Sequence, residues 1–401
     1  MRVVYLAGPG DIIRTYGYWK NGLNDPNEMN VTYSSQFFDV CSKLNADAYV
    51  ISSNKRKDIF QSGRFKIEHR PNEASKQSGF KYHYGVFIYT IGIIITAIRY
   101  KADVMVVSAG VHWFFLAIMP LFGIKIIPTL HCTLYSKYKV PSNINKIINK
   151  LNSLFFYRCC FAIMSASFEL TRQIKGMVGN KVPIIEFLPL YTKDVFFNIK
   201  KSQFDGKNLN IIYIGRIEYE KGVFDLLKMY KVLKKTGLIL TFNICGSGAL
   251  LADLRVKVAD LGANENIIFH GHCNRDQLVS LISKSHIFVV PTRTDFLEGF
   301  NQVVVEAVLS GRPVITSDVC PALEHVNSAA LQVRPDDVND YAKKIQSLYG
   351  NKVLYESKIK ACKHEQEKFY EKKSSWGNGL EYILTSIDDK SMKSYFLKRA
   401  N

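Results

Sequence analysis

The 401-residue sequence is poor in acidic residues, with 35 Asp and Glu against 53 Lys and Arg, and its formal net charge is +18. Residues 1–200 hold 25 of the basic and 12 of the acidic residues, so the front half carries +13 and the back half +5. Such a surplus favours an anionic partner: a membrane surface, a nucleic acid or a phosphorylated substrate. Charge alone does not choose among the three.

Cysteine is also scarce, with eight residues scattered along the chain and no CxxC pair. That distribution excludes a disulfide framework and favours a reducing cytosol. The first apolar run, in MRVVYLAGPGDIIRT, is about five residues long and leads into a glycine-rich turn, which indicates a first strand and not a signal peptide. We therefore expect a cytoplasmic protein.

Apolar runs long enough to cross a membrane are missing. Residues 86–98 form a run of about thirteen residues, against roughly 20 for a spanning helix. Residues 104–130 are interrupted by His112, Pro120 and Lys125, and a buried strand, a helix and a second strand explain them better. Because this stretch is rich in Trp and Phe within the basic half, peripheral binding to a membrane stays open.

Repeats and low-complexity tracts are absent, and short apolar runs instead alternate with helical patterns. The runs are continuous in apolar character, which is typical of parallel strands covered on both faces. The cycle occurs twice, so we predict two doubly wound α/β domains. Strands are expected at 2–7, 47–52, 103–108, 124–129, 160–165, 209–214, 239–245, 266–270, 286–291 and 313–316, and helices include 33–44, 111–122 and 223–235.

The boundary between the domains is expected within 188–208, where a proline precedes the polar and basic stretch KKSQFDGKN. This places a first domain at 1–190 and a second at 208–375. The end of the chain, about 376–401, turns apolar and aromatic again. We expect it to form a helix that packs back on the first domain.

The first motif with chemical potential is GRIEYEKG, residues 215–222, which follows a buried strand and precedes a helix. Gly215 permits a tight turn, and Arg216 and Lys221 place two cations at the carboxyl end of a strand, where open α/β sheets bind ligands. A diphosphate suits this position because cations and helix N-terminal N–H groups stabilise it. The alternative is a solvated charged turn.

The second motif is CGSGALLADL, residues 245–254, again at the end of a strand and ahead of a helix. Gly246 and Gly248 would let the backbone approach a ligand closely. The alternative is an ordinary turn between a strand and a helix.

The third motif, PTRTDFLEGFNQVVVEAVLSGRP at 291–313, contains two carboxylates that are eight residues apart. Glu298 would lie in the loop before a helix that begins near Asn301, and Glu306 would lie inside that helix. A carboxylate in an apolar helix is costly unless it accepts hydrogen bonds, and a sugar diol offers two donors. The peptide N–H groups of residues 299–302 could bind an oxyanion or hydroxyls. The alternatives are surface charge for Glu298 and a structural carboxylate for Glu306.

Together and in this order, GRxxxxKG, GxG and the ExxxxxxxE pair within PT…EGF…EA…GRPVI resemble the retaining glycosyltransferases of family four, in glycosyl transferases group 1. The resemblance covers residues 209–330 and extends to the front half only through its pattern and isolated positions. It implies the GT-B fold, in which two Rossmann-like parallel-sheet domains face each other across a cleft. The first domain would bind the acceptor and the second the nucleotide-sugar donor.

The resemblance also implies roles for individual residues. Arg216 and Lys221 would neutralise the departing diphosphate, Glu298 would contact the donor sugar, and Glu306 would hold the ribose hydroxyls. Many family members have glycine where this chain has Asn301, so the identity of the donor sugar is not carried over. The implied catalytic residues are His131, Glu298, Arg216 and Lys221, and the implied donor-binding residues are Gly8, Gly10, Arg216, Lys221, Gly246, Gly248, Glu298, Gly299, Phe300, Asn301, Gln302 and Glu306.

In the front half, the resemblance places Gly8 and Gly10 of the GPGD loop opposite the diphosphate, with a simple turn as the alternative. His131 stands in PTLHCTLY just past a strand, where family members place a histidine near the donor sugar and the acceptor hydroxyl. His112 in SAGVHWFF is the second candidate, and the alternative for it is a helix-start histidine packed by Trp113.

No cofactor and no obligatory metal are expected, because fixed cations and amides can stabilise the leaving diphosphate. The HGHC segment at 270–273 is a poor metal site, since His270 and His272 alternate along an expected strand and point to opposite faces. Retention is implied by the family. We expect front-face attack by an acceptor hydroxyl that the departing phosphate deprotonates, with His131 orienting it or stabilising charge.

The sequence therefore predicts a retaining, hexosyltransferase-type glycosyltransferase that acts on a lipid-linked or polysaccharide acceptor. Lipopolysaccharide, O-antigen, capsule or exopolysaccharide synthesis at the inner face of the cell membrane is the expected setting. One alternative is a sugar-nucleotide epimerase of the same fold, which lacks this set of motifs. Another is a nucleic-acid-binding protein, but the basic residues are dispersed and do not form one compact module.

Overall fold

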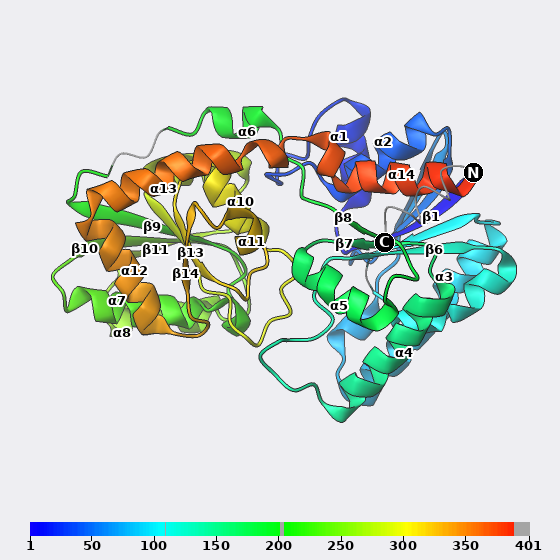
Figure 1. Ribbon diagram of the computed structural model, residues 1–401, viewed down its shortest axis with the longest axis horizontal. Coiled ribbons are helices and arrows are strands. Elements are labelled where there is room, and N and C mark those ends of the chain that lie inside the picture. The colour runs from blue at the N-terminus through cyan, green and yellow to red at the C-terminus, as the bar shows by residue number, and fades with distance from the viewer. Residues whose placement is uncertain (109, 201–203, 389–401) are drawn as a thin grey trace.

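The computed structural model describes residues 1–108, 110–200 and 204–388, which form two α/β units (Figure 1). An eight-stranded sheet in the order β3-β4-β2-β1-β5-β6-β7-β8 builds the first unit, and a six-stranded sheet in the order β11-β10-β9-β12-β13-β14 builds the second. All neighbouring strands are parallel except β3 and β4. The strands are β1 Arg2–Ala7, β2 Asp47–Ser52, β3 Asp58–Ser62, β4 Phe65–His69, β5 Val104–Val107, β6 Lys125–Leu130, β7 Ile163–Ser165, β8 Ile184–Glu186, β9 Asn208–Ile214, β10 Ile239–Cys245, β11 Ile267–Gly271, β12 Ile287–Val290, β13 Val314–Ser317 and β14 Ala330–Val333.

Helices cover both faces of the first sheet. Val3 and Tyr5 of β1 lie in the apolar cluster shared with α2 and α14, whereas Val4 and Leu6 lie in the cluster shared with α3, η2 and α4. Successive side chains of a strand point to opposite faces, so a doubly covered strand needs a continuous apolar run. The helices of this unit are α1 Ile12–Lys20, α2 Tyr33–Lys43, η1 Glu73–Lys76, α3 Gly79–Arg99, η2 Trp113–Phe122, α4 Asn143–Cys159, α5 Phe168–Val178 and the C-terminal α14 Trp376–Asp388.

The second sheet is covered in the same way. Ile211 and Tyr213 of β9 pack with α7, α8 and α12, and Ile212 packs on the opposite face in the cluster that includes α10 and α13. The short helix α6 Lys193–Phe197 lies in the connection between the two sheets. The helices of the second unit are η3 Tyr219–Lys221, α7 Val223–Lys234, α8 Leu251–Asp260, α9 Arg275–Lys284, α10 Gln302–Leu309, α11 Leu323–Val326, α12 Val338–Gly350 and α13 Lys352–Glu365.

The end of the chain returns from the second unit to the first. The turns η4 Glu367–Phe369 and η5 Lys372–Ser374 lead from α13 to α14, which lies beside α2 at the top of Figure 1. Trp376 is fully buried there, with its ring centroid 5.7 Å from that of Tyr5. The sequence predicts a helix at about 376–401 that packs back on the first domain, and α14 occupies the first part of this range. Residues 389–401 of the predicted helix lie outside the described part of the chain.

The predicted strands agree with the observed ones to within about three residues, and the predicted boundary segment lies between β8 and β9. Strands β3, β4, β8 and β14 were not predicted. The helix predicted at 111–122 is instead the 3-10 helix η2, which contains Pro120. Proline lacks the N–H group that a continuous α-helix requires, which accounts for the difference.

Helix α3 extends beyond the apolar run at 86–98, whose length predicts a segment too short to cross a membrane. It has 21 residues and is, by length and composition, able to cross a membrane, although no membrane is part of the structure. In the fold, one of its faces packs on the first sheet through residues such as Ile93 and Ala97. Only 22% of its most apolar window is buried.

Candidate active site

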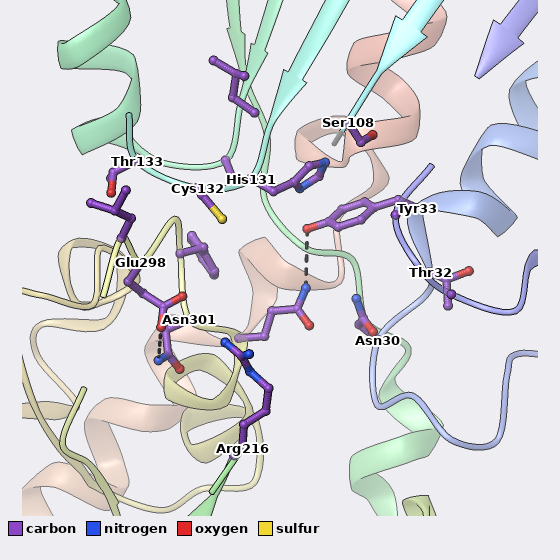
Figure 2. Close-up of a pocket in the computed structure, with 18 of the residues that line it drawn as sticks. Asn30, Thr32, Tyr33, Ser108, His131, Cys132, Thr133, Arg216, Glu298 and Asn301 are labelled. Carbon is purple, nitrogen blue, oxygen red and sulfur yellow. Dashed lines mark hydrogen bonds between the residues drawn. The ribbon is translucent and has the colours of Figure 1, made fainter. Parts of the chain in front are cut away.

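A cavity of about 1170 Å³ lies between the two units, and residues of both line it. Its walls include loops that follow the carboxyl ends of strands, with residues 8–11 after β1, 131–134 after β6, 215–221 after β9 and 297–303 after β12. Ligands bind at this edge of open parallel sheets. Figure 2 shows side chains of both units surrounding one space.

The predicted site residues fall into two groups. Nearly all of those in the loops after β1, β6, β9 and β12 line the cavity: Gly8, Gly10, His131, Arg216, Lys221, Glu298, Phe300, Asn301 and Gln302. The remaining four, Gly246, Gly248, Gly299 and Glu306, are not among its lining residues. The structure therefore brings residues that are almost 300 positions apart to a single cleft.

Lys221 and Glu298 approach from separate loops and form an ion pair in this cleft. Nζ of Lys221 donates a hydrogen bond to Oε2 of Glu298 at 2.7 Å, and the two side chains are 15% and 11% exposed. Nζ also lies 3.7 Å from the centroid of the Phe296 ring. A charge-assisted hydrogen bond and a cation–π contact thus fix a cation and a carboxylate side by side.

Asn301 donates to the same carboxylate oxygen as Lys221. Its Nδ2 donates to Oε2 of Glu298 at 2.9 Å (Figure 2) and lies 3.3 Å from Oγ1 of Thr292. Its backbone has φ 74°, a left-handed conformation that favours glycine. Glycine would adopt this backbone easily but would leave the carboxylate without its amide donor.

Arg216 occupies a more exposed position than Lys221. Its side chain is 56% exposed, and its Nη1 donates to Oε1 of Glu218 at 2.9 Å. The guanidinium carbon lies 5.6 Å from the centroid of the Phe296 ring. The two predicted cations therefore flank one aromatic ring at the same wall of the cavity.

His131 packs among aromatic side chains, and its burial favours the neutral imidazole. Burial lowers its pKa to about 4, and its ring lies 4.6 Å from that of Tyr33 and 5.4 Å from that of Phe187. Nε2 is 3.1 Å from Oγ1 of Thr129, which in turn accepts a hydrogen bond from Nε1 of Trp376 at 2.8 Å. At neutral pH this histidine can exchange hydrogen bonds but carries no charge.

Gly299 lies where a loop of the second unit contacts a loop of the first. A Cβ atom at this position would lie 1.8 Å from the carbonyl oxygen of His131, which is far inside van der Waals contact. Only a residue without a side chain permits the glutamate loop of the second unit to approach the histidine loop of the first this closely.

Gly246 and Gly248 make a similar close contact, but within the second unit. Added Cβ atoms would meet the carbonyl oxygens of Gly215 at 1.8 Å and of Ile217 at 2.4 Å. The glycines therefore let the loop after β10 pack against the loop that carries Arg216. Contact of these glycines with a nucleotide stays a prediction.

Glu306 lies inside α10, 7% exposed, and no cation in the described part of the chain forms an ion pair with it. Tyr191 offers its hydroxyl at 3.5 Å. Burial, and secondarily the charge of Glu28, raise the pKa of Glu306 to about 7. The structure thus provides few internal donors for this carboxylate, and its predicted binding to ribose hydroxyls stays a prediction.

The glycine loop of the first unit lies on the same cavity. The hydroxyl of Ser52 is 3.0 Å from the carbonyl oxygen of Gly8 and 2.7 Å from that of Gly10. Asp11 then caps α1 by accepting from the amide of Arg14 at 3.0 Å. The loop is held from β2 and by the start of α1, which keeps its backbone at the cleft.

His112, the second histidine candidate, lines another part of the cavity. Its Nε2 lies 2.9 Å from Nδ1 of His83 in α3, and burial together with the neighbouring His83 lowers its pKa. His112 stands at the start of η2, as its alternative reading expects, but its ring packs on Phe114 and Phe115, whereas the ring of Trp113 packs on Phe156. Gly299, in the loop of Glu298, lies against the backbone of His131.

Several cavity residues were missed from the sequence. Tyr33 accepts a weak hydrogen bond from Nε2 of Gln302 at 3.5 Å, and Asn30, Thr32 and Cys132 stand nearby (Figure 2). The sequence signal that could have pointed to them is Thr32, a residue type that often caps helices. It caps α2 by accepting a hydrogen bond from the amide of Ser35. A cap locates the start of a helix but does not show that this start faces a cleft.

Among the described residues, no group of three or more His, Cys, Asp or Glu side chains is arranged to hold a metal ion. His270 lies 2.9 Å from Oδ1 of Asn243, and β11 ends at Gly271, so His272 lies beyond the strand. Metal independence stays a prediction.

Comparison with known proteins agrees with this geometry. Residues 194–365 match the family described as Glycosyl transferases group 1. An uncharacterized 41.2 kDa protein of the cps region of Klebsiella pneumoniae is 25% identical over 295 residues, which cover 68% of this chain and 76% of that protein. The capsular polysaccharide biosynthesis glycosyltransferase CapM of Staphylococcus aureus is 29% identical over 155 residues, but these cover only 37% of this chain and 39% of CapM.

Solved structures show the same fold over nearly the whole chain. Sucrose-phosphate synthase from Thermosynechococcus elongatus has a TM-score of 0.73 at 14% identity and covers 98% of this chain and 100% of its own. Anabaena HepE in complex with UDP has a TM-score of 0.66 at 14% identity and covers 96% and 99%. The predicted GT-B arrangement of two facing parallel-sheet domains is confirmed.

Proposed function

Because this chain carries a domain of the glycosyl transferases group 1 family at residues 194–365, we propose that it is a retaining glycosyltransferase. It would move a sugar from a nucleotide-diphosphate sugar to a lipid-linked or polysaccharide acceptor. The observation that carries this proposal is the meeting of Lys221, Glu298 and Arg216 at one wall of the cleft, with His131 of the other unit close by.

Two cations at one wall suit the chemistry of a leaving diphosphate. As the bond between the anomeric carbon and phosphate oxygen breaks, negative charge builds on the phosphate and positive charge on the sugar. Lys221, which is held at the cleft with little exposure, and the more exposed Arg216 would stabilise that phosphate. The glycine loop at residues 8–10 lies on the same cavity and would face the diphosphate from the first unit.

Glu298 and the start of α10 would hold the sugar. The carboxylate is already oriented by Lys221 and Asn301, so it can accept hydrogen bonds from sugar hydroxyls at a fixed position. The amides of residues 299–302 stand at the N-terminus of α10, where partial positive charge favours hydroxyl and phosphate oxygens. Glu306, deeper in that helix, would accept the ribose hydroxyls.

The acceptor hydroxyl would attack from the face that the phosphate leaves. The bond from acceptor oxygen to anomeric carbon forms as the bond to phosphate oxygen breaks, and the hydroxyl proton passes to that phosphate oxygen. His131 would orient the hydroxyl through a hydrogen bond, in keeping with a burial that favours its neutral form. No metal ion is needed for these steps.

Capsule, O-antigen, exopolysaccharide or lipopolysaccharide synthesis is the proposed setting, supported by the capsular relative CapM. Such a protein would work in the cytoplasm, peripherally on the inner face of the cell membrane, where an anionic surface would attract the basic first unit. An epimerase is not favoured, since residues 194–365 match the glycosyl transferases group 1 family and the relative CapM is named a glycosyltransferase.

A donor screen tests the proposal. Purified protein would be tested against UDP-, GDP- and ADP-sugars for a thermal shift and for slow hydrolysis of the sugar–phosphate bond. We expect one nucleotide class to stabilise the protein and one sugar to be released with the anomeric configuration retained. Release with inverted configuration would contradict the retaining assignment, and an epimer formed from nucleotide sugar alone would favour the other enzyme class.

A further inference from the structure

The outer surface of the first unit carries α3, a helix that is apolar on the face that packs on the sheet and on much of the opposite face. One face of α3 packs on the sheet through Val86, Thr90, Ile93 and Ala97, which recur at helical spacing. A helix of this character is normally buried in protein or in lipid. The opposite face is exposed, and it presents Phe80, Tyr84, Phe87, Ile88, Ile91 and Ile95.

Neighbouring elements extend this exposed apolar surface. η2 packs beside α3, and α4 packs beside η2, on the same side of the first sheet (Figure 1). Contiguous exposed apolar surface of this kind marks an interaction site. We refer to the exposed sides of α3, η2 and α4 as the α3–α4 face, which also includes Leu121 and Phe122 of η2 and Ile144, Ile147 and Leu151 of α4.

The charge of this segment has a single sign. Residues 79–159 contain nine basic residues and one acidic residue, Asp103, and residues 104–168 contain no Asp or Glu at all. Lys81, Lys146 and Lys150 are exposed on α3 and α4, and none of them forms an ion pair with a described residue. Apolar side chains edged by unpaired cations complement the interface of an anionic bilayer.

Helices α3 and α4 also contribute residues to the wall of the cavity. Tyr82 and His83 of α3 line it, as do Asn145, Asn149 and Asn152 of α4. Oδ1 of Asn152 is buried and, among the described residues, has no hydrogen-bond partner. The α3–α4 face therefore adjoins the part of the cavity that the first unit lines, on the predicted acceptor side.

We propose that the α3–α4 face docks this protein on an anionic lipid bilayer, with α3 lying along the headgroup boundary and the cavity open toward the membrane. This docking proposal rests on the proposed function for the nature of the acceptor. α3 lies in the interface and does not span, because Ile93 and Ala97 belong to the core of the first sheet. Withdrawing them would expose the apolar face of β1 and β5, including Val4 and Val107, to water.

Sedimentation with vesicles of phosphatidylcholine, alone or mixed with phosphatidylglycerol, tests this surface. The variant Phe80→Ser/Leu121→Ser/Ile147→Ser replaces side chains that are 83%, 83% and 62% exposed, so it should fold normally. We expect wild type to bind the mixed vesicles and the variant to bind them at least about tenfold more weakly, since apolar burial at the interface is lost.

A matched control makes the same change on the second unit. Ile239→Ser/Val256→Ser/Val353→Ser replaces side chains that are 58%, 61% and 78% exposed. This variant should bind vesicles as wild type does. Equal losses in both triple variants would overturn the proposal, because they would mean that general surface hydrophobicity, and not this face, drives binding.

Two further experiments test the role of the lysines on the α3–α4 face and the insertion of this face into the bilayer. Lys81→Gln/Lys146→Gln/Lys150→Gln should remove most of the preference for phosphatidylglycerol. A tryptophan introduced as Phe80→Trp should shift its emission to shorter wavelength with mixed vesicles, whereas Val353→Trp should not. An unchanged Phe80→Trp spectrum, or dimerisation through the face without vesicle binding, would overturn the proposal.

Failure of this proposal can be separated from failure of the proposed function. Hydrolysis of the nucleotide sugar in vesicle-free buffer reports the donor site alone and should be equal in wild type and in the triple serine variant. Turnover without vesicle binding would overturn the docking surface only, and vesicle binding without any nucleotide-sugar turnover would overturn the proposed function only.

Discussion

Asn301 stands where a left-handed backbone favours glycine, and its amide, together with Lys221, holds the Glu298 carboxylate. The sequence shows that asparagine replaces the glycine of many family members, but it does not show that the asparagine amide contacts Glu298. Asn301 directly precedes α10, and its side chain reaches back three residues to Glu298. This contact depends on the loop conformation, which local sequence patterns do not determine.

Replacing Asn301 with glycine should leave the fold intact, because glycine adopts φ 74° without strain. One hydrogen bond to the carboxylate is lost, so kcat should fall roughly five- to tenfold, equivalent to about 1 kcal/mol. Steady-state kinetics would show the fall in kcat with a smaller change in KM. Asn301→Asp, which places a second carboxylate beside Glu298, should lose more activity; an Asn301→Asp variant as active as Asn301→Gly would contradict this role.

Glu306 makes stability depend on pH. Its pKa is raised to about 7 from 4.5, so between these values the folded state binds more protons than the unfolded state. Stability therefore falls as pH rises through this range. Glu306→Gln removes the cost of ionising a buried acid, and the variant should gain on wild type as pH rises, by up to about 3 kcal/mol above pH 7. Urea unfolding at several pH values measures this, and a difference independent of pH would contradict it.

Helix α14 shows what an element far along the chain contributes to the cleft. The sequence predicts a C-terminal helix from its apolar and aromatic character, but not the contact that it makes. Trp376 donates to Thr129 from 247 residues away, and Thr129 lies 3.1 Å from His131. Long-range side-chain contacts of this kind depend on how the elements pack, so the connection of α14 to the histidine became visible only in the structure.

Trp376→Phe should lower kcat because Thr129 loses its donor and no longer holds His131 in one orientation. The control is Trp19→Phe, which also breaks an indole hydrogen bond, to Asp39 at 2.7 Å, but lies away from the cavity. Both variants should lose some stability, and only Trp376→Phe should change the pH profile of kcat. Equal kinetic effects would indicate a purely structural role for Trp376.

The elements themselves were largely readable from the sequence, since doubly covered parallel strands leave continuous apolar runs. The exposed strand β3 alternates less clearly, and its pairing with β4 was missed. α3 was underestimated because Tyr and His residues at its start interrupt the apolar run without ending the helix. Its exposed face could not be inferred, since sequence shows apolarity but not what covers it.

At the scale of the whole molecule, the cleft depends on how closely the two units approach. Ion pairs cross between them, as with Lys137 and Asp318 at 2.8 Å and Arg172 and Glu324 at 2.6 Å. These pairs are exposed and each contributes little. The backbones of the two units also meet at Gly299, which lies directly against His131.

Gly299→Ala should separate the two units without unfolding either. The added Cβ would meet a backbone oxygen at 1.8 Å, so the glutamate loop must retreat and turnover should fall at least about tenfold. Small-angle scattering would show a more open molecule, and circular dichroism would stay unchanged. Gly176→Ala, in α5 with open space around it, is the control and should keep full activity; wild-type turnover by Gly299→Ala would contradict the close approach.

The central claim is that Lys221 stabilises a leaving diphosphate in this cleft, and hydrolysis of the nucleotide sugar by Lys221→Ala tests it most directly. Lys231→Ala, an exposed lysine on α7 outside the cavity, is the matched control. The account predicts a loss of about a hundredfold or more in kcat for Lys221→Ala, with a folded protein, and no loss for Lys231→Ala. Near wild-type hydrolysis by folded Lys221→Ala would contradict it.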